Sequence, residues 1–166
     1  MFSLFGNKPD VTAKEVGDAL FKLFLKSAGE SQERTLQLIP KENWERADSE
    51  LMYLRIIAMD FGVKSALGKS LKTNQILKVF YEHLESVTTL EDMPNKFFMQ
   101  DLDSRFSAYG HAPDYDNDLP LIAKIGSKFC ELCGIQDDPQ VADHAGVIFG
   151  TTSKVVRDLV GGFKIN

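Results

Sequence analysis

The sequence has few of the residues that would identify a secreted, membrane-spanning or metal-scaffolded protein. Its 166 residues include 2 cysteines, 3 histidines and 1 tryptophan. Two cysteines cannot form a disulfide framework, and no apolar run approaches the length of a membrane span. A chain of this length buries about two-thirds of its unfolded surface, so it needs no metal or disulfide to fold. We therefore expect a protein of the reducing cytoplasm.

Positive charge is also scarce. Lysine and arginine number 19 against 24 aspartate and glutamate residues, so the net charge is −5. A negative chain gives no general electrostatic support for binding nucleic acid. The charge is uneven, because residues 64–78 contain four lysines and no acid, whereas residues 85–118 contain eight acids and two bases. These segments are either complementary faces for a partner or two ordinary solvated faces.

Apolar residues are plentiful, at 43% of the chain, and they recur at intervals of three and four more often than two. This spacing is typical of α-helices, and no stretch alternates as a strand would. The implied loops are short except around residues 110–118, which favours antiparallel neighbours. We predict an all-α fold, a single compact bundle of about six to seven helices, mostly antiparallel neighbours. It forms one domain over residues 1–166, with 1–10 as a candidate flexible N-terminus.

The clearest helix is predicted over residues 41–67. Its heptad-spaced apolar residues share one face, and Gly68 suits a left-handed helix stop. That face consists of Trp44, Ala47, Leu51, Leu54, Ala58 and Phe61.

Two other helices have strong start signals. Thr12 and Glu15 form a capping box before a helix that ends near residue 28. Asp138 caps the last helix, 139–160, which has a candidate break near Thr151 and Thr152. The remaining helices are predicted over 31–39, 73–87, 94–109 and 119–133.

One lysine-bearing turn approaches the pattern of a phosphate-binding loop without matching it. Five residues separate Gly62 from Gly68, where such a loop requires four, and the preceding residues have helical spacing. A weaker anion site at the start of the next helix is an alternative, with Lys64, Lys69 and Lys72 as its candidate residues. The competing interpretation is a helix end followed by an ordinary turn.

The two cysteines have the C-x-x-C spacing of redox and zinc sites. No second cysteine pair exists to complete a zinc site. Cys130 and Cys133 also lie near a predicted helix C-terminus, where the helix dipole disfavours a thiolate. We predict two buried and unreactive thiols.

The most polar segment, residues 111–118, has aspartates at alternate positions, as at the start of a calcium loop. An EF-hand is excluded because Leu119 stands in place of the glycine and Ile125 in place of the bidentate acid. An acidic loop that caps the next helix is the simpler interpretation. No cofactor and no metal is expected, and the weak candidates for a looser metal site are His111, Asp114, Asp116 and Asp118.

One strip of the last predicted helix has almost no side chains, because Ala142, Gly146 and Gly150 recur every four residues. Each glycine inside a helix costs roughly 1 kcal/mol relative to alanine. Close approach of another helix would compensate for this cost. The alternative is a groove that receives a partner or a ligand.

No catalytic motif accompanies these features. The sequence contains no His-Glu-x-x-His, no Gly-x-Ser-x-Gly and no Gly-x-Gly-x-x-Gly. His83 and His144 are weak candidates for acid–base catalysis. The sequence therefore favours a protein without enzymatic activity. It favours a non-catalytic protein-interaction or regulatory module that binds a protein partner or a second copy of itself.

The alternative is a small-molecule- or metal-binding helical bundle, with hydrolytic activity as one variant. Its ligand would lie among Phe98, Phe106, Tyr109 and Phe129. A connected pocket of several hundred Å³ with polar groups inside it would favour this alternative. Nucleic acid and a membrane span are not expected.

Overall fold

The computed structural model describes residues 8–27, 29–90, 95–110, 120–136 and 138–166. Nearly all regular structure in these residues is helical, so the predicted all-α bundle is confirmed. No helix in these ranges is both long and apolar enough to cross a membrane. The helices are α1 (Ala13–Lys26), α2 (Glu30–Gln37), the 3₁₀ turn η1 (Lys41–Asn43), α3 (Trp44–Leu67), α4 (Leu71–Leu90), α5 (Asn95–Gly110), α6 (Leu121–Cys133) and α7 (Pro139–Gly161).

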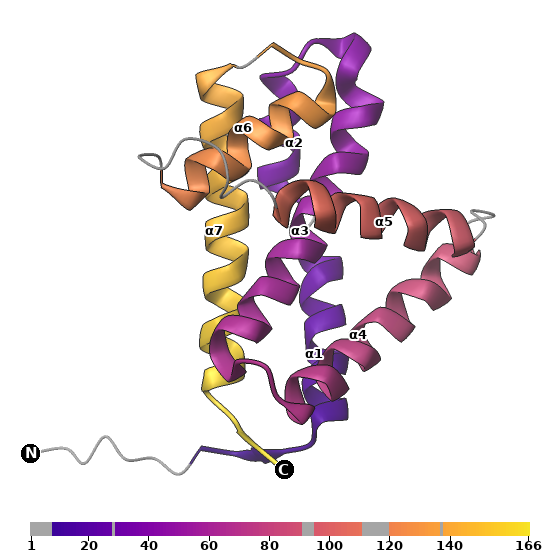
Figure 1. The fold of residues 1–166 in the computed structure, drawn as a ribbon, viewed down its shortest axis with the longest axis vertical. Coiled ribbons are helices and arrows are strands. Elements are labelled where there is room, and N and C mark those ends of the chain that lie inside the picture. Colours follow the sequence, from indigo (N-terminus) through magenta and orange to yellow (C-terminus); the bar gives the residue numbers. More distant parts are fainter. Residues whose placement is uncertain (1–7, 28, 91–94, 111–119, 137) are drawn as a thin grey trace, which may run out of the picture.

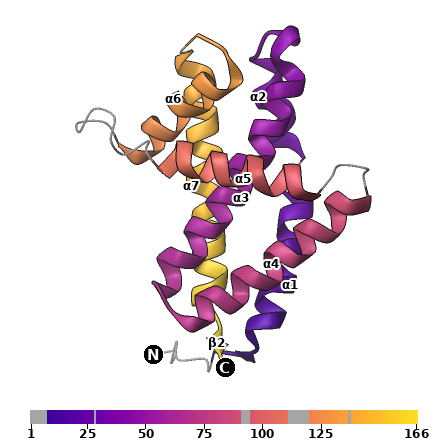
Figure 2. The same ribbon diagram turned by 45° about the vertical axis from the view of Figure 1, so that its right-hand side comes forward.

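Helix α3 occupies the centre of the bundle and contacts each of the helices α1, α2, α4, α5, α6 and α7. The most extensive contacts join α3 to α7, α6 to α7, and α1 to α4. Helices α6 and α7 run antiparallel, as expected of neighbours in the sequence (Figure 1). The pairs α3–α7 and α1–α4 are distant in sequence and run in the same general direction (Figure 1). Figure 2 shows α5 crossing α3 near its middle.

Several helix ends follow the predicted signals. The Thr12 hydroxyl accepts from the Glu15 N–H at 3.2 Å, and the Glu15 carboxylate accepts from the Thr12 N–H at 2.7 Å, which completes the capping box. Gly68 ends α3 with a φ of 62°, a left-handed value that favours glycine. Helix α4 starts two residues before the predicted Thr73, because the Ser70 hydroxyl accepts from the Thr73 N–H.

The predicted inward face of α3 is only partly correct. Its middle residues are fully buried, but Trp44 and Phe61, towards its two ends, are partly exposed. Burial in the middle of α3 extends around the whole helix, including every residue from 53 to 60. A central helix is covered by neighbours on all sides, which a one-faced heptad pattern does not predict. Helix α7 is continuous through Thr151 and Thr152, so the candidate break is wrong.

Two very short strands lie outside the prediction. Strands β1 (Asp10–Val11) and β2 (Lys164–Ile165) pair in parallel and bring the described ends of the chain together. The Asn166 N–H donates to the Val11 carbonyl at 2.9 Å. Two residues are too few to show a period-two pattern. Residues 8–10 of the candidate flexible terminus therefore lie beside the C-terminal segment, while residues 1–7 lie outside the described residues.

The hydrophobic core lies around α3 and reaches all the neighbouring helices. Close packing of large side chains at its centre provides most of the driving force for this arrangement. Its largest fully buried apolar side chains are Phe80, Phe98, Phe129, Leu20, Leu51, Leu54, Ile56, Met59, Ile76 and Leu102.

Candidate functional site

An apolar pocket of about 360 Å³ lies between α1, α3 and α7. Its volume falls within the range of small-molecule sites, about 300–1,000 Å³. Three helices supply its walls, so the pocket exists only in the folded bundle. It is lined by Leu23, Ser27, Arg55, Met59, Val147, Ile148, Thr151, Thr152 and Val155, and we call it the α1–α3–α7 pocket.

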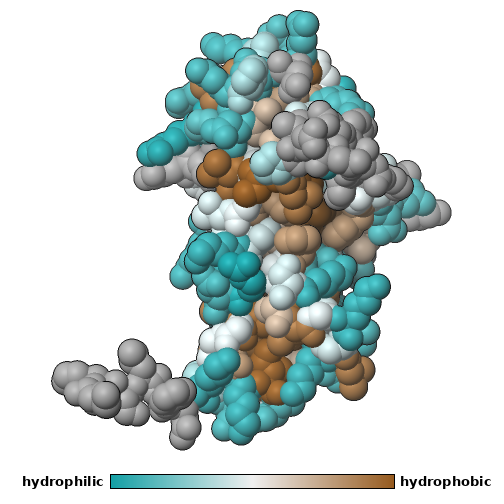
Figure 3. All heavy atoms as spheres, turned by 60° about the vertical axis from the view of Figure 1, so that its left-hand side comes forward, coloured by the Kyte–Doolittle hydropathy of each residue, from teal (hydrophilic) through white to brown (hydrophobic). Residues whose placement is uncertain are grey.

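The α7 wall of this pocket follows from helical spacing. Val147, Thr151 and Val155 are four residues apart and therefore share one side of α7. Val147 is 51% exposed and Val155 is 44% exposed, so part of this apolar wall is open to solvent. Figure 3 brings the side of α6 and α7 forward and shows hydrophobic residues in an interrupted band between hydrophilic ones. Exposed apolar residues that are not isolated indicate a surface that something can cover.

Among the described residues that line the pocket, Arg55 is the only titratable one. Its side chain comes from the middle of α3 and is only 5% exposed. The Nε atom donates to the Leu51 carbonyl at 3.4 Å, and the guanidinium lies 5.4 Å from the centre of the Phe24 ring. The Nη1 atom is buried and has no hydrogen-bond partner. Burial lowers the pKa of Arg55, because the charged form is poorly solvated there.

Sequence reasoning missed Arg55, although a signal was present. It is the one charged residue within the apolar run from Leu51 to Met59. A charge in such a run on a central helix is expected to be buried, and buried arginines are usually paired. The pattern shows the anomaly, but only the fold shows that the residue borders a pocket.

A second buried charge lies on the opposite side of α3. Glu50 is 1% exposed and forms an ion pair with Arg105 of α5, whose side chain is 23% exposed. Burial raises the pKa of Glu50 more than the neighbouring Arg105 lowers it. The Glu50 Oε2 atom and the Tyr109 hydroxyl are buried without hydrogen-bond partners. This cluster connects α3 to α5 and lies apart from the residues that line the pocket.

The strip of Ala142, Gly146 and Gly150 packs against α6. A Cβ at Gly146 would lie 2.5 Å from the Ile122 carbonyl oxygen, and one at Gly150 would lie 2.9 Å from the Ile122 Cδ1 atom. On the α6 side, a Cβ at Gly126 would lie 2.0 Å from the Ala142 carbonyl oxygen. Ile122 of α6 therefore occupies the space beside Gly146 and Gly150.

The three lysines of the candidate anion site do not converge on one point. Lys64 forms an ion pair with Asp60 at 2.5 Å. Lys72 donates to the Ile165 carbonyl, which ties α4 to β2. Lys69 lies with Lys64 at an open depression of about 490 Å³ beside the start of α4. Two of the three cations therefore have partners within the protein.

The cysteines are buried, and neither is in a disulfide. Burial raises the pKa of Cys133 to about 12, because the thiolate would lose its hydration. A thiol with this pKa is almost entirely protonated near neutral pH, so Cys133 is a poor nucleophile.

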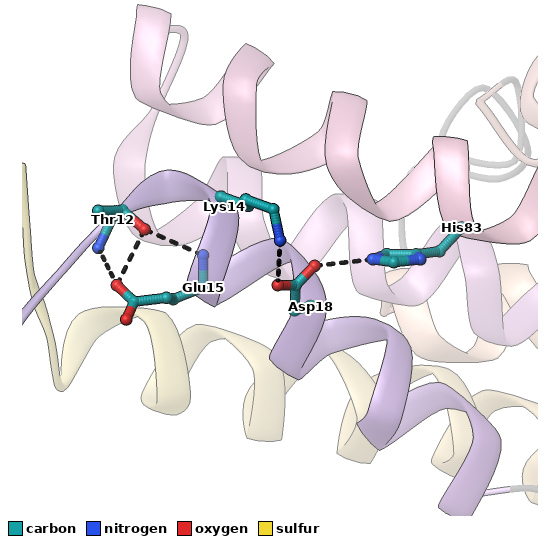
Figure 4. Close-up of polar contacts among 5 residues, drawn as sticks. All are labelled: Thr12, Lys14, Glu15, Asp18 and His83. Carbon is teal, nitrogen blue, oxygen red and sulfur yellow. Dashed lines mark hydrogen bonds and ion pairs between the residues drawn. The ribbon is translucent and has the colours of Figure 1, made fainter.

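His83 forms part of a polar bridge between α1 and α4 (Figure 4). Its Nε2 atom lies 2.7 Å from Asp18, and Lys14 lies 2.8 Å from the other oxygen of the same carboxylate. The hydrogen bonds from Lys14 and His83 lower the pKa of Asp18. Phe21 stacks on the His83 ring with a centroid distance of 4.9 Å. These contacts join one helix to the other, so the arrangement around His83 is that of a structural bridge.

The metal candidates His111, Asp114, Asp116 and Asp118 lie outside the described residues. Within the described ranges, no group of three or more histidine, cysteine, aspartate or glutamate side chains could hold a metal ion. Among the aromatic residues of the sequence-based ligand site, Phe98, Tyr109 and Phe129 are buried in the core. They do not line the α1–α3–α7 pocket.

Comparisons with known protein families, with curated proteins and with solved structures find no match to this chain. The function must therefore be inferred from the geometry of the pocket itself.

Proposed function

We propose that this chain is a non-catalytic binding protein that holds a small, largely apolar ligand in the α1–α3–α7 pocket. The observation that carries the proposal is an apolar cavity of about 360 Å³ with walls from three helices. It corresponds to the alternative function derived from the sequence, at a different location. Transfer of apolar ligand surface from water into such a pocket is favourable by about 25 cal/mol per Å².

The lining of the pocket supports binding rather than catalysis. Apart from Arg55, its polar residues are Ser27, Thr151 and Thr152. The Ser27 hydroxyl donates to the Phe24 carbonyl at 2.9 Å. Arginine remains protonated at neutral pH and cannot exchange a proton as a general acid or base. No pair of a nucleophile and a base occurs among the lining residues that the structure describes.

The test uses the neutral dye Nile red, whose fluorescence rises in an apolar site. The natural chain is expected to enhance the dye's emission at micromolar concentration. Thr151→Trp places a bulky side chain in the pocket wall and should abolish the enhancement. The matched control is Lys154→Trp, on the same helix but outside the pocket lining, and it should retain the enhancement.

Circular dichroism and thermal unfolding would establish that both variants fold. The proposal is contradicted if the natural chain does not bind the dye. It is also contradicted if Thr151→Trp and Lys154→Trp bind the dye equally well, because the dye would then occupy another site.

A protein partner is the second candidate, and the exposed α7 wall favours it. Val147 and Val155 lie on the same face of α7, and each is about half exposed to solvent. An amphipathic segment or a second copy of the chain could cover this wall. Sedimentation at micromolar concentration tests the homodimer: a strict monomer excludes self-association, and a dimer that Val147→Glu dissociates supports it.

A further inference from the structure

We infer that the ligand of the α1–α3–α7 pocket is a small apolar molecule with one carboxylate, and that this carboxylate binds Arg55. This inference rests on the proposed function and specifies the chemical class of the ligand.

Arg55 is a buried charge without an ionic partner among the described residues. A guanidinium that is removed from water without a partner is strongly unfavourable, so buried arginines are normally paired with an anion. Arg55 is 5% exposed, and no ion pair joins it to any other described residue within 4.0 Å. Of the acids in the described ranges, Asp48 is the one that raises its pKa. Asp48 lies two helical turns away and accepts a hydrogen bond from Gln32 instead.

Arg105 of α5 contrasts with Arg55 in the same molecule. Arg105 is more exposed than Arg55, yet it has a carboxylate partner in Glu50. The more exposed arginine, Arg105, thus has an acidic partner, although water can solvate its charge better than it can solvate the charge of Arg55. A ligand anion would provide for Arg55 what Glu50 provides for Arg105.

The Arg55 guanidinium is held by two contacts within the protein. The Leu51 carbonyl accepts from Nε, and Phe24 lies near the guanidinium, so these two contacts hold the group in place. Nη1 remains without a partner. A planar guanidinium binds a carboxylate through two parallel N–H donors, an arrangement that an ammonium group cannot reproduce. A guanidinium held by these contacts, on a residue that lines the pocket, is suited to a carboxylate.

The apolar lining of the pocket determines the size and polarity of the ligand outside its carboxylate. Leu23, Met59 and Ile148 provide apolar walls, and about 360 Å³ suits one short hydrocarbon chain or ring. Because Arg55 is the only charged residue among the described residues of the lining, the ligand should carry its charge at one end. A medium-chain aliphatic carboxylate has these properties.

The experiment compares decanoate with decanol, which have the same chain length but differ in charge. Both are titrated calorimetrically into the full chain at neutral pH, below the concentrations at which they aggregate. We expect the carboxylate to bind about tenfold to a hundredfold more tightly, the ratio for a hydrogen bond to a charged group. Decanol should still bind, because the apolar walls are common to both ligands.

The variants Arg55→Met and Arg55→Lys locate the preference. In Arg55→Met the preference for decanoate should disappear while decanol binding is retained. Arg55→Lys should reduce the preference without removing it, since the charge remains but the planar fork is lost. If Arg55→Met does not fold, Arg55→Lys still tests whether the preference for decanoate depends on the guanidinium. The matched control is Arg157→Met, an exposed arginine of α7 outside the pocket, which should behave as the natural chain does.

The outcomes separate the two proposals. If decanol binds as tightly as decanoate, the inference about Arg55 is wrong while the proposed function stands. If both arginine variants retain the full preference, the inference is again wrong. If neither ligand binds the natural chain, the proposed function fails, and the inference fails with it.

Discussion

The two sides of α3 differ in how their buried charges are paired. On the side of α5, Glu50 is paired with Arg105. On the side of α1 and α7, Arg55 borders a pocket and has no anionic partner among the residues that the structure describes. Helix α7 shows the same contrast in packing, since its α6 side has no room for a Cβ at Gly146 and its other side lines the pocket. We therefore expect the Glu50 carboxylate to find its cation within the chain and the Arg55 guanidinium to find its anion in a ligand.

The largest expected effect comes from removing Arg105. Arg105→Met should lower the free energy of unfolding by about 3 kcal/mol at neutral pH, because Glu50 is left buried without its partner. Urea unfolding monitored by circular dichroism measures this loss. The double variant Glu50→Leu with Arg105→Met should recover most of it, since no buried charge remains. A single variant as stable as the natural chain would contradict the claim that this side depends on the pair.

The next effect tests the packing between α6 and α7. Gly126→Ala should destabilise by roughly 2 kcal/mol, because the new Cβ would press on the Ala142 carbonyl. Helix propensity alone would predict a gain of about 1 kcal/mol for this change. Gly161→Ala is the matched control, since nothing lies within 4 Å of its added Cβ. Thermal unfolding of the two variants distinguishes a packed interface from a loose one.

Arg55→Met should change the free energy of unfolding in the opposite direction to Arg105→Met. Without ligand, the variant is expected to be more stable than the natural chain by roughly 1 kcal/mol, because an unpaired buried guanidinium is replaced by an apolar side chain of similar length. The same urea titrations provide the measurement. A loss comparable to that of Arg105→Met would show that Arg55 is satisfied within the fold, and the contrast between the two sides of α3 would disappear.

The smallest expected effect is a dependence of the free energy of unfolding on pH, caused by the titration of Glu50. Its pKa is raised in the folded protein, so the unfolded chain releases this proton first as the pH rises. Its contribution to stability is therefore present below the ordinary glutamate pKa of 4.5 and is lost as the pH rises through the folded value. Glu50→Gln cannot ionise, so its stability relative to the natural chain should increase across this window, as urea unfolding at a series of pH values would measure. Asp18, whose pKa is lowered, acts in the opposite sense by losing stability as the pH falls, and it is present in both proteins.

Much of the local structure could be predicted because its signals are local. The capping box of Thr12 and Glu15, the left-handed Gly68 and the Asp138 cap each depend on residues a few positions apart. The predicted start of α4 is wrong by two residues, since the Ser70 hydroxyl is an earlier cap than the pattern of apolar residues indicates. The short pairing of β1 with β2 could not be predicted, because it joins residues more than 150 positions apart through two residues each.

The candidate site could be predicted only in part. The small-residue strip of α7 indicated a close helix contact, and the structure shows Ile122 in that contact. The aromatic residues expected around a ligand are instead core residues, because hydrophobicity is the same signal for both roles.

By itself, the sequence determined that this chain coils into helices and where most of them end, since helical periodicity and capping act within a few turns of the backbone. Only the tertiary structure decided which charges are paired. Glu50 meets an arginine 55 positions away, whereas Arg55 has no such partner among the described residues, because helix packing in three dimensions selects the neighbours of each buried side chain. The pocket is a product of that packing, because its walls come from three helices that are far apart in the sequence.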